Sequence, residues 1–214
     1  MKEIDLSILL VDSIPARIYL ALLNKHGYKL RKIVFIEIES RSFKYRVARR
    51  VLGSFLTKKI KKNIRNFFNK KNKEYDGLSK IFLHRNNLTC KEINECLEQY
   101  SDNKIDRVIL TGLDDVNLVE YIKHSSERTF LFTGGGILKD SLLSIDGVKI
   151  IHIHPGIVPE VKGADCFFWS YLLKGRAGYS IFYMNSGIDT GDILFKKEFD
   201  LDFSVITTSV EQTD

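Results

Sequence analysis

One short strand and the loop after it constrain this chain more than any other stretch. Ile150 to His154 alternates apolar residues with two histidines, and Pro155 and Gly156 follow at once. Side chains two apart on a strand point to the same face, so His152 and His154 are expected to project together where the strand ends. Titratable groups at a strand end, followed by a stiff loop, are a common way to build a site.

The residues alone allow three interpretations of this pair. In the first, the histidines are ordinary polar residues with structural hydrogen bonds, and the nearby glycines only form turns. In the second, His152, His154 and Asp189 bind a metal ion, as in a metal-dependent hydrolase. In the third, one histidine moves protons in a metal-free acyl transfer while an aspartate orients it.

The rest of the chain predicts an α/β fold, a Rossmann-like, doubly wound and mostly parallel sheet, with one domain over residues 1–214. Residues 6–11 form a continuous apolar run, as expected of a strand buried on both faces. Ser13 can cap the helix that follows, with Pro15 in its first turn. Further strands are expected at 32–38, 80–84, 107–111, 129–133, 179–184 and 193–199, the last two antiparallel. Further helices are expected at 89–100, up to His124, and at 166–173.

Four short motifs stand in a fixed order in the second half of the chain: residues 152–159, Gly163, residues 178–181 and residues 188–194. Together they resemble the folate-dependent formyltransferases, the family of glycinamide ribonucleotide, methionyl-tRNA and nucleotide-sugar N-formyltransferases. The family pattern reads Asn-x-His-Pro-Ser/Gly-x-x-Pro, then a Gly-x-Ser/Thr strand, then Asp-x-Gly ahead of an apolar strand. The strong match covers about Thr133 to Phe199.

The resemblance implies roles for the residues that fall on these motifs. His154 stands at the family's catalytic histidine and Asp189 at its catalytic aspartate, with Asp192 a rival carboxylate in the same turn. His152 stands where the family has an asparagine that helps to bind the formyl oxygen and the oxyanion formed from it. A histidine can donate a hydrogen bond there, as a neutral tautomer or as a cation.

The resemblance also implies the reaction. A formyl group passes from the co-substrate 10-formyltetrahydrofolate to a primary amine of a small molecule, here expected to be an amino sugar of a nucleotide-sugar or glycan precursor. A histidine near its pKa can take and return the protons without a metal. The residues expected to contact the co-substrate are Gly134, Gly135, Gly136 and Asp192. Those expected to contact the amine substrate are Asp12, Ser13 and Gly163.

Residues 41–73 are a different kind of sequence. They hold 13 of the 33 Lys and Arg residues and no Asp or Glu, whereas the other residues hold 20 basic and 27 acidic side chains. Their apolar residues follow helical spacing, which predicts a basic amphipathic helical insert. Three interpretations of the insert are open: it packs on the domain, it lies on an anionic membrane surface, or it binds a partner. Nucleic acid is the least favoured partner. In the last two cases the chain could be a catalytically inactive formyltransferase-like module.

Composition sets further bounds on the chain. No apolar run approaches the roughly 20 residues needed to cross a bilayer, and acidic residues follow Met1 closely. The three cysteines have no CxxC spacing and are expected to be free thiols. We therefore expect a cytoplasmic protein, with the insert as its route to peripheral contact at the inner face of the membrane. Family members continue with further elements, so we expect the chain to be truncated at its C-terminus.

Overall fold

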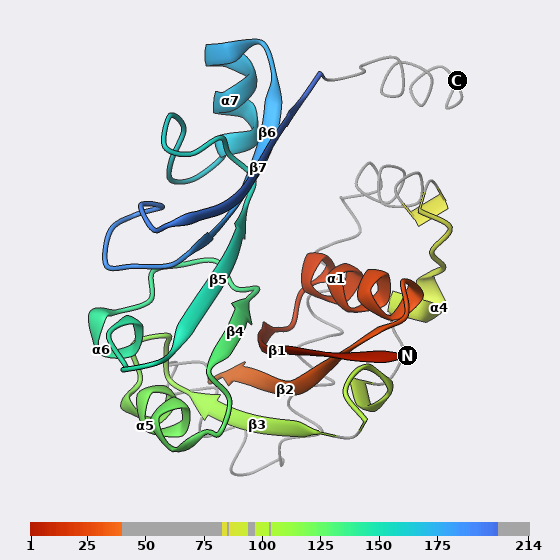
Figure 1. Ribbon diagram of the computed structural model, residues 1–214, viewed down its shortest axis with the longest axis vertical. Coiled ribbons are helices and arrows are strands. Elements are labelled where there is room, and N and C mark those ends of the chain that lie inside the picture. The colour runs from red at the N-terminus through yellow and green to blue at the C-terminus, as the bar shows by residue number, and fades with distance from the viewer. Residues whose placement is uncertain (40–82, 85, 94–96, 103, 201–214) are drawn as a thin grey trace.

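The computed structural model of the chain describes residues 1–39, 83–84, 86–93, 97–102 and 104–200 (Figure 1). In this part of the chain the strands form one seven-stranded sheet with the order β3-β2-β1-β4-β5-β6-β7. The strands are β1 (Lys2–Val11), β2 (Tyr28–Ile38), β3 (Ile105–Leu110), β4 (Thr129–Phe132), β5 (Lys149–His154), β6 (Ala177–Tyr183) and β7 (Ile193–Phe199). The expected basic insert at 41–73 lies outside the described residues.

The sheet is mostly parallel, as the sequence predicts. Strand β1 pairs in parallel with β2 and β4, and the parallel order continues to β3 on one side and β5 on the other. Strands β6 and β7 then run antiparallel, which confirms the expected hairpin near the C-terminal end. Figure 1 shows that this hairpin and α7 (Cys166–Lys174) extend from one end of the molecule, away from α1 (Ile14–Lys25).

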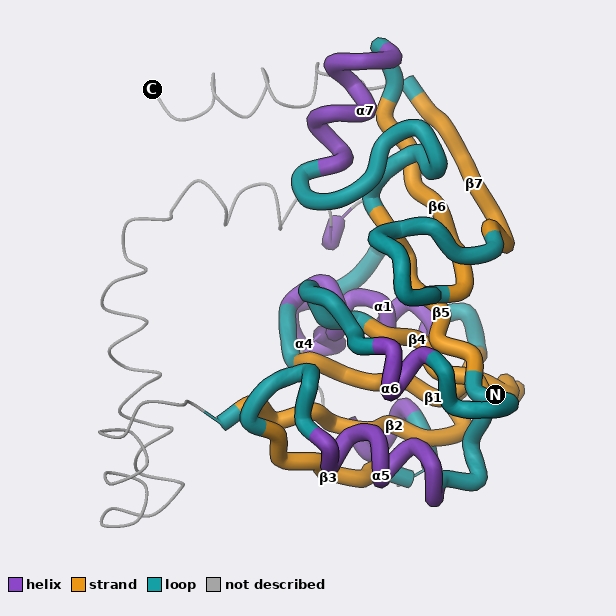
Figure 2. The backbone as a smooth tube through the Cα atoms, turned by 90° about the vertical axis from the view of Figure 1, so that its left-hand side faces the viewer, coloured by secondary structure: helices purple, strands orange, loops and turns teal. Residues whose placement is uncertain are grey.

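Helices cover both faces of the parallel part of the sheet. One core cluster joins α1 and the 3₁₀ helix η2 (Leu97–Tyr100) to the sheet, and it includes Ile8 and Leu10. The other joins α5 (Val116–His124) and α6 (Asp140–Leu143) to the opposite face, and it includes Leu9. Figure 2 shows α5 and α6 together beside the strands. The continuous apolar sequence of β1 is thus explained, since successive side chains enter different cores.

The helix starts follow from local hydrogen bonds. Ser13 accepts a hydrogen bond from the Ala16 backbone N–H at 3.3 Å and caps α1 as predicted. Thr89 and Glu92 form a reciprocal capping box at α4 (Cys90–Ile93), with the Glu92 carboxylate accepting the Thr89 N–H at 2.6 Å. Each cap satisfies backbone donors that have no partner inside the helix.

Two sequence expectations need correction. The strand expected at 80–84 is wrong at Leu83 and His84, which are helical, while 80–82 lie outside the described residues. The helix expected over 89–100 begins as α4 but its described end, η2, is a 3₁₀ helix. Among the helices described here, none has the length and apolar character needed to span a membrane.

Candidate active site

The candidate site lies at the carboxyl ends of the parallel strands. Strands β1, β4 and β5 run in the same direction, so the segments that follow them meet at one edge of the sheet. On β5, Ile150 belongs to the core cluster under α5 and α6, whereas Ile151 and Ile153 pack against the cluster under α1. By alternation, His152 and His154 lie on the same side as Ile150, as the sequence predicts.

His154 is joined to Asp189 across a long stretch of sequence. Its Nε2 atom lies 3.5 Å from Oδ2 of Asp189, and the same carboxylate oxygen accepts the Gly163 backbone N–H at 2.7 Å. His154 is only 3% exposed, and its Nε2 atom is buried without a hydrogen-bond partner within the part of the chain described. Buried polar atoms normally have partners. A buried nitrogen left unpartnered beside a carboxylate calls for an explanation, and a catalytic role is one of the known ones.

The electrostatic surroundings favour neutral rings for both histidines. The pKa of His154 is lowered, mainly by burial and further by the neighbouring His152. The charge of Asp189 and a hydrogen bond with the Val161 backbone raise this pKa, but by less. Burial also lowers the pKa of His152, against smaller raising effects of the Phe132 backbone and Asp189. Because both pKa values lie below the ordinary value for histidine, both rings are neutral near neutral pH.

His152 is held by its neighbours on the adjacent strands. It stands opposite Phe132 on β4 and Phe182 on β6. Its ring meets that of Phe182 edge-on, with centroids 5.9 Å apart, and lies 6.2 Å from the ring of His154. Its Nδ1 atom lies 3.4 Å from the Phe132 carbonyl oxygen. These contacts fix the ring beside the candidate catalytic histidine.

The loop after β5 is fixed by Ser180, a residue of the third motif. The buried Ser180 hydroxyl donates to the Gly156 carbonyl at 2.8 Å and accepts from the Val158 N–H at 3.1 Å. At Gly156 a Cβ atom would lie 2.7 Å from His154 Nε2 and 2.6 Å from the Cβ of Cys166. The glycine thus leaves room for the histidine.

The turn that carries Asp189 is shaped by Asn185. The Asn185 side-chain oxygen accepts hydrogen bonds from the Gly187 N–H at 3.0 Å and from the Thr190 hydroxyl at 2.6 Å. Asp189 itself has φ of 49°, in the left-handed region that few residues other than glycine adopt. Such conformations persist where surrounding contacts fix them, often at functional sites. Sequence reasoning missed Asn185, although the Asn-Ser-Gly sequence signals an Asx turn.

A second residue that the sequence did not single out is Cys166. Its buried thiol donates a hydrogen bond to the Gly163 carbonyl at 3.1 Å. This bond helps to fix Gly163, whose backbone N–H donates to Asp189. Burial raises its pKa, and the carboxylates of Asp189 and Asp165 raise it further. The thiol is therefore a neutral donor and not a thiolate.

The other predicted contact residues are placed differently. The Asp192 side chain is exposed, and its backbone carbonyl accepts the Tyr183 N–H at 3.0 Å at the end of the hairpin. Of the two rival carboxylates in this turn, only that of Asp189 is found beside His154. The Asp12 carboxylate pairs with Arg17 at 2.7 Å, next to the Ser13 cap. Asp12 and Ser13 both follow β1, at the same edge of the sheet as His154. Their side-chain contacts stabilise the start of α1.

The three glycines after β4 also lie at this edge. A Cβ atom at Gly134 would lie 2.6 Å from the Phe132 ring and 2.8 Å from Cγ2 of Val11, so only a glycine fits between these side chains. Around Gly135 no atom lies within 4 Å of the corresponding position. The loop therefore packs tightly at its start and opens toward its middle.

The described residues do not support the metal-site interpretation. Among them, no group of three or more His, Cys, Asp or Glu side chains is arranged to hold a metal ion. The Nδ1 atom of His152 faces a backbone carbonyl, and His154 faces Asp189.

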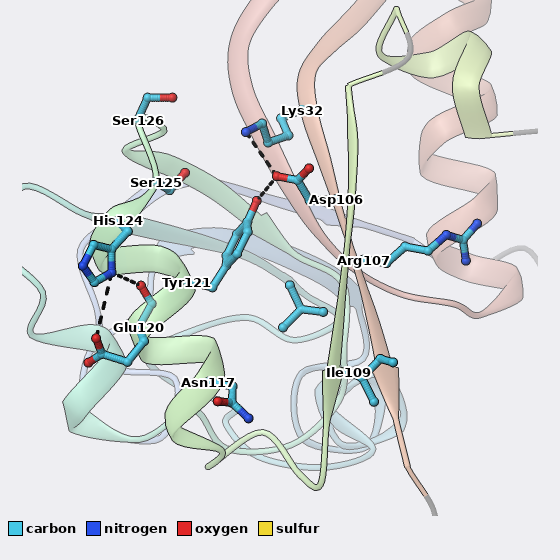
Figure 3. Close-up of a pocket in the computed structure, with 11 residues that line it drawn as sticks. Lys32, Asp106, Arg107, Ile109, Asn117, Glu120, Tyr121, His124, Ser125 and Ser126 are labelled. Atoms are coloured by element: carbon cyan, nitrogen blue, oxygen red, sulfur yellow. Dashed lines mark hydrogen bonds and ion pairs between the residues drawn. The ribbon is translucent and has the colours of Figure 1, made fainter. Parts of the chain in front are cut away.

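A pocket of about 700 Å³ lies away from this site, between β3 and α5 (Figure 3). In it the Tyr121 hydroxyl donates to Asp106 at 2.5 Å, and Lys32 pairs with the same carboxylate at 3.3 Å. Strand β3 is the edge strand of the sheet, and β2, β1 and β4 separate it from β5. The pocket is thus not part of the histidine site.

Comparison with known proteins agrees with the motif pattern. Residues 116–212 match the family model described as formyl transferase. Methionyl-tRNA formyltransferase of Syntrophus aciditrophicus (strain SB) is 34% identical over 90 residues, which are 41% of this chain and 28% of that protein. Phosphoribosylglycinamide formyltransferase of Bacillus subtilis (strain 168) is 32% identical over 77 residues, which are 36% of this chain and 40% of that protein. The match thus spans well under half of either relative.

The fold has counterparts among solved structures. Glycinamide ribonucleotide transformylase 1 from Symbiobacterium toebii superposes with a TM-score of 0.51 at 13% identity, over 97% of this chain and 78% of that one. At this identity the likeness concerns the fold alone. Over its second half the chain is similar in sequence to the formyltransferases.

Proposed function

We propose that this chain transfers a formyl group from 10-formyltetrahydrofolate to a primary amine. The observation that carries the proposal is the buried, unpartnered Nε2 atom of His154, 3.5 Å from Asp189. Both residues stand at the family's motif positions, within the segment that matches the formyl transferase model. A histidine paired with a carboxylate is the arrangement that proton transfer during acyl transfer requires.

The residues at the sheet edge suit this co-substrate. When bound, 10-formyltetrahydrofolate supplies an activated formyl group. His154 then holds a proton at Nε2 or passes it between the attacking and leaving nitrogens, and the Asp189 charge stabilises the protonated ring. Gly135 leaves open space beside the strand ends, as the approach of a ligand to the backbone requires.

For the acceptor we propose a small amine, an amino sugar of a nucleotide-sugar or glycan precursor. The support for this finer proposal is the charge of residues 41–73, whose 13 Lys and Arg residues suit binding of phosphate groups. The two relatives compared above are named for other acceptors, methionyl-tRNA and phosphoribosylglycinamide. A panel of amines that includes these three classes would identify the acceptor by its rate of formylation.

The first experiment is calorimetric titration of the protein with 5-formyltetrahydrofolate, a stable analogue, in parallel with His154→Ala. We expect saturable binding to both proteins, because the histidine acts on protons and contributes little to affinity. Turnover of His154→Ala should fall about 10²- to 10⁴-fold, the range for loss of a general acid–base group. Absence of binding by well-folded protein would contradict the proposal. If the protein binds the analogue but formylates none of the amines, it would be a catalytically inactive, folate-binding module.

A further inference from the structure

Asp189 reaches His154 from a backbone conformation that most residues avoid. Its φ of 49° lies in the left-handed region, which a residue with a Cβ atom adopts only where its surroundings favour it. Its carboxylate meets two groups at once, Nε2 of His154 at 3.5 Å and the Gly163 N–H at 2.7 Å. Both contacts belong to the side chain, and the backbone of the turn has contacts of its own.

The side-chain oxygen of Asn185 joins the start of this turn to its end. It accepts the Gly187 N–H at 3.0 Å, which forms an Asx turn, and the Thr190 hydroxyl at 2.6 Å. An amide oxygen has two lone pairs, so it can accept from both donors. The two donors stand on either side of Asp189 in the sequence, two residues before it and directly after it.

Two glycines let the turn close in this way. A Cβ atom at Gly187 would collide with the Thr190 hydroxyl, and one at Gly191 would collide with the Tyr183 carbonyl oxygen. At the same place the Tyr183 N–H donates to the Asp192 carbonyl at 3.0 Å. The turn is therefore packed against the end of β6 on one side and against its own Thr190 side chain on the other.

We infer that Asn185 and Thr190 are positioning residues for the proposed formyl transfer, because their hydrogen bond holds the turn in the conformation that places the Asp189 carboxylate beside His154. The two residues act through Asp189 and not on the substrate themselves. The inference rests on the proposed function where it assigns a role in that reaction. The link from the turn to the histidine can be tested without the reaction.

The effect of losing this hydrogen bond can be followed at His154. The titratable groups near its ring are His152 on the same strand, Asp189 in the turn and Cys166 at the start of α7. Of these groups, Asp189 is the one that raises the pKa of His154. If the turn loosens, the carboxylate spends time farther from Nε2, so the pKa of His154 falls and the protonated ring is less stabilised.

The first test follows the titration of His154 by NMR. Thr190→Val removes the hydroxyl but keeps the shape of the side chain, whereas Thr190→Ser keeps the hydroxyl. We expect the His154 midpoint to fall in Thr190→Val and in Asn185→Ala, and to stay near the wild-type value in Thr190→Ser. The control is Ser186→Ala, an exposed residue of the same turn, which should leave the midpoint unchanged. An unchanged midpoint in Thr190→Val, or an equal shift in Thr190→Ser or Ser186→Ala, would overturn the inference.

The second test asks whether the hydrogen bond acts through Asp189. Turnover of Thr190→Val should fall about 10-fold or more, since a misplacement of about 1 Å can cost about 100-fold, while its affinity for 5-formyltetrahydrofolate should match the wild type. In an Asp189→Ala background, Thr190→Val should cause no further loss. Unchanged turnover of Thr190→Val, or a full additional loss in that background, would reject the positioning role. If the wild type formylates no amine, the proposed function fails, and the His154 titration still decides whether the turn positions Asp189.

Discussion

The Nε2 atom of His154 and the Oδ2 atom of Asp189 lie 3.5 Å apart, and that same oxygen accepts the Gly163 N–H at 2.7 Å. One carboxylate thus joins the end of β5, the loop before α7 and the turn between β6 and β7. The backbone hydrogen bond fixes the carboxylate, and the carboxylate sets the electrostatic field at the histidine. The charge of Asp189 and the protonation of His154 are therefore linked.

The first prediction concerns this pair. In Asp189→Asn the pKa of His154 should fall further, because a charge that raises it is lost. A histidine whose folded pKa lies below its unfolded value of about 6.5 stabilises the fold above that pH, and this contribution is lost as the pH falls toward the folded pKa. The variant should therefore lose more stability than the wild type between neutral and mildly acidic pH. Titration of the His154 resonances and urea unfolding across this range would check both statements.

Asp192→Asn is the matched control, because Asp192 lies in the same turn with an exposed side chain. It should leave the His154 titration within the error of the wild type. A rise in the pKa of His154 in Asp189→Asn, or equal shifts in the two variants, would contradict the assigned pairing.

The fold could be predicted well where hydrophobic patterns are strong. The apolar run of β1, the alternation in β5 and the hairpin of β6 and β7 each appear in the structure as expected. The segment at 80–84 failed because a short apolar run does not distinguish a strand from a helix, and Leu83 packs in a small cluster against α1. The helical conformation of Leu83 and His84 thus follows from tertiary packing and not from the local sequence pattern.

The site was less predictable than the fold. The motifs singled out His154 and Asp189, and the structure brings them together, although their catalytic roles remain predictions. The contact of His152 Nδ1 depends on a carbonyl of the neighbouring strand, and the hydrogen bond of Cys166 depends on a loop three residues before it. Such contacts arise from the packing of segments, so no spacing rule in the sequence contains them.

The second prediction concerns Ser180, whose hydroxyl joins β6 to the loop after β5. Ser180→Ala leaves the Gly156 carbonyl and the Val158 N–H without their partner. Buried groups left unsatisfied in this way cost about 1–3 kcal/mol, so the free energy of unfolding should fall by that amount. Ser170→Ala is the control, because Ser170 is equally buried but its hydroxyl has no hydrogen-bond partner among the described residues. Urea unfolding should show little loss or a gain for Ser170→Ala; equal losses would refute the role of Ser180.

The third prediction concerns the Tyr121–Asp106 pair of the β3–α5 pocket. The Tyr121 hydroxyl and Lys32 lower the pKa of Asp106, the hydroxyl being the larger influence. A carboxylate with a lowered folded pKa stabilises the fold above its unfolded pKa, and this contribution disappears as the pH falls through the folded value. Tyr121→Phe should therefore raise the pKa of Asp106 and reduce the stability gained on going from strongly acidic to neutral pH.

Carbon-detected NMR of the Asp106 carboxyl, together with unfolding at several acidic pH values, would measure both effects. Tyr28→Phe serves as control, because Tyr28 is 41% exposed at the start of β2, away from Asp106. An unchanged Asp106 titration in Tyr121→Phe would show that the short hydrogen bond does not set the charge of this carboxylate.

The last prediction concerns the space that Gly156 leaves beside His154. In Gly156→Ala the new methyl group would lie 2.7 Å from His154 Nε2 and 2.6 Å from the Cys166 side chain, closer than packed atoms allow. Because Ser180 holds the Gly156 carbonyl, the loop cannot simply move away, so the histidine or α7 must shift. Overpacking of this kind costs about 1–3 kcal/mol, and the His154 resonances should move. Gly135→Ala is the matched control, since its methyl group would meet no atom within 4 Å. If Gly156→Ala keeps wild-type stability and unchanged His154 resonances, the loop can move without disturbing the histidine. The short distance between Gly156 and His154 would then not be the reason for a glycine at this position.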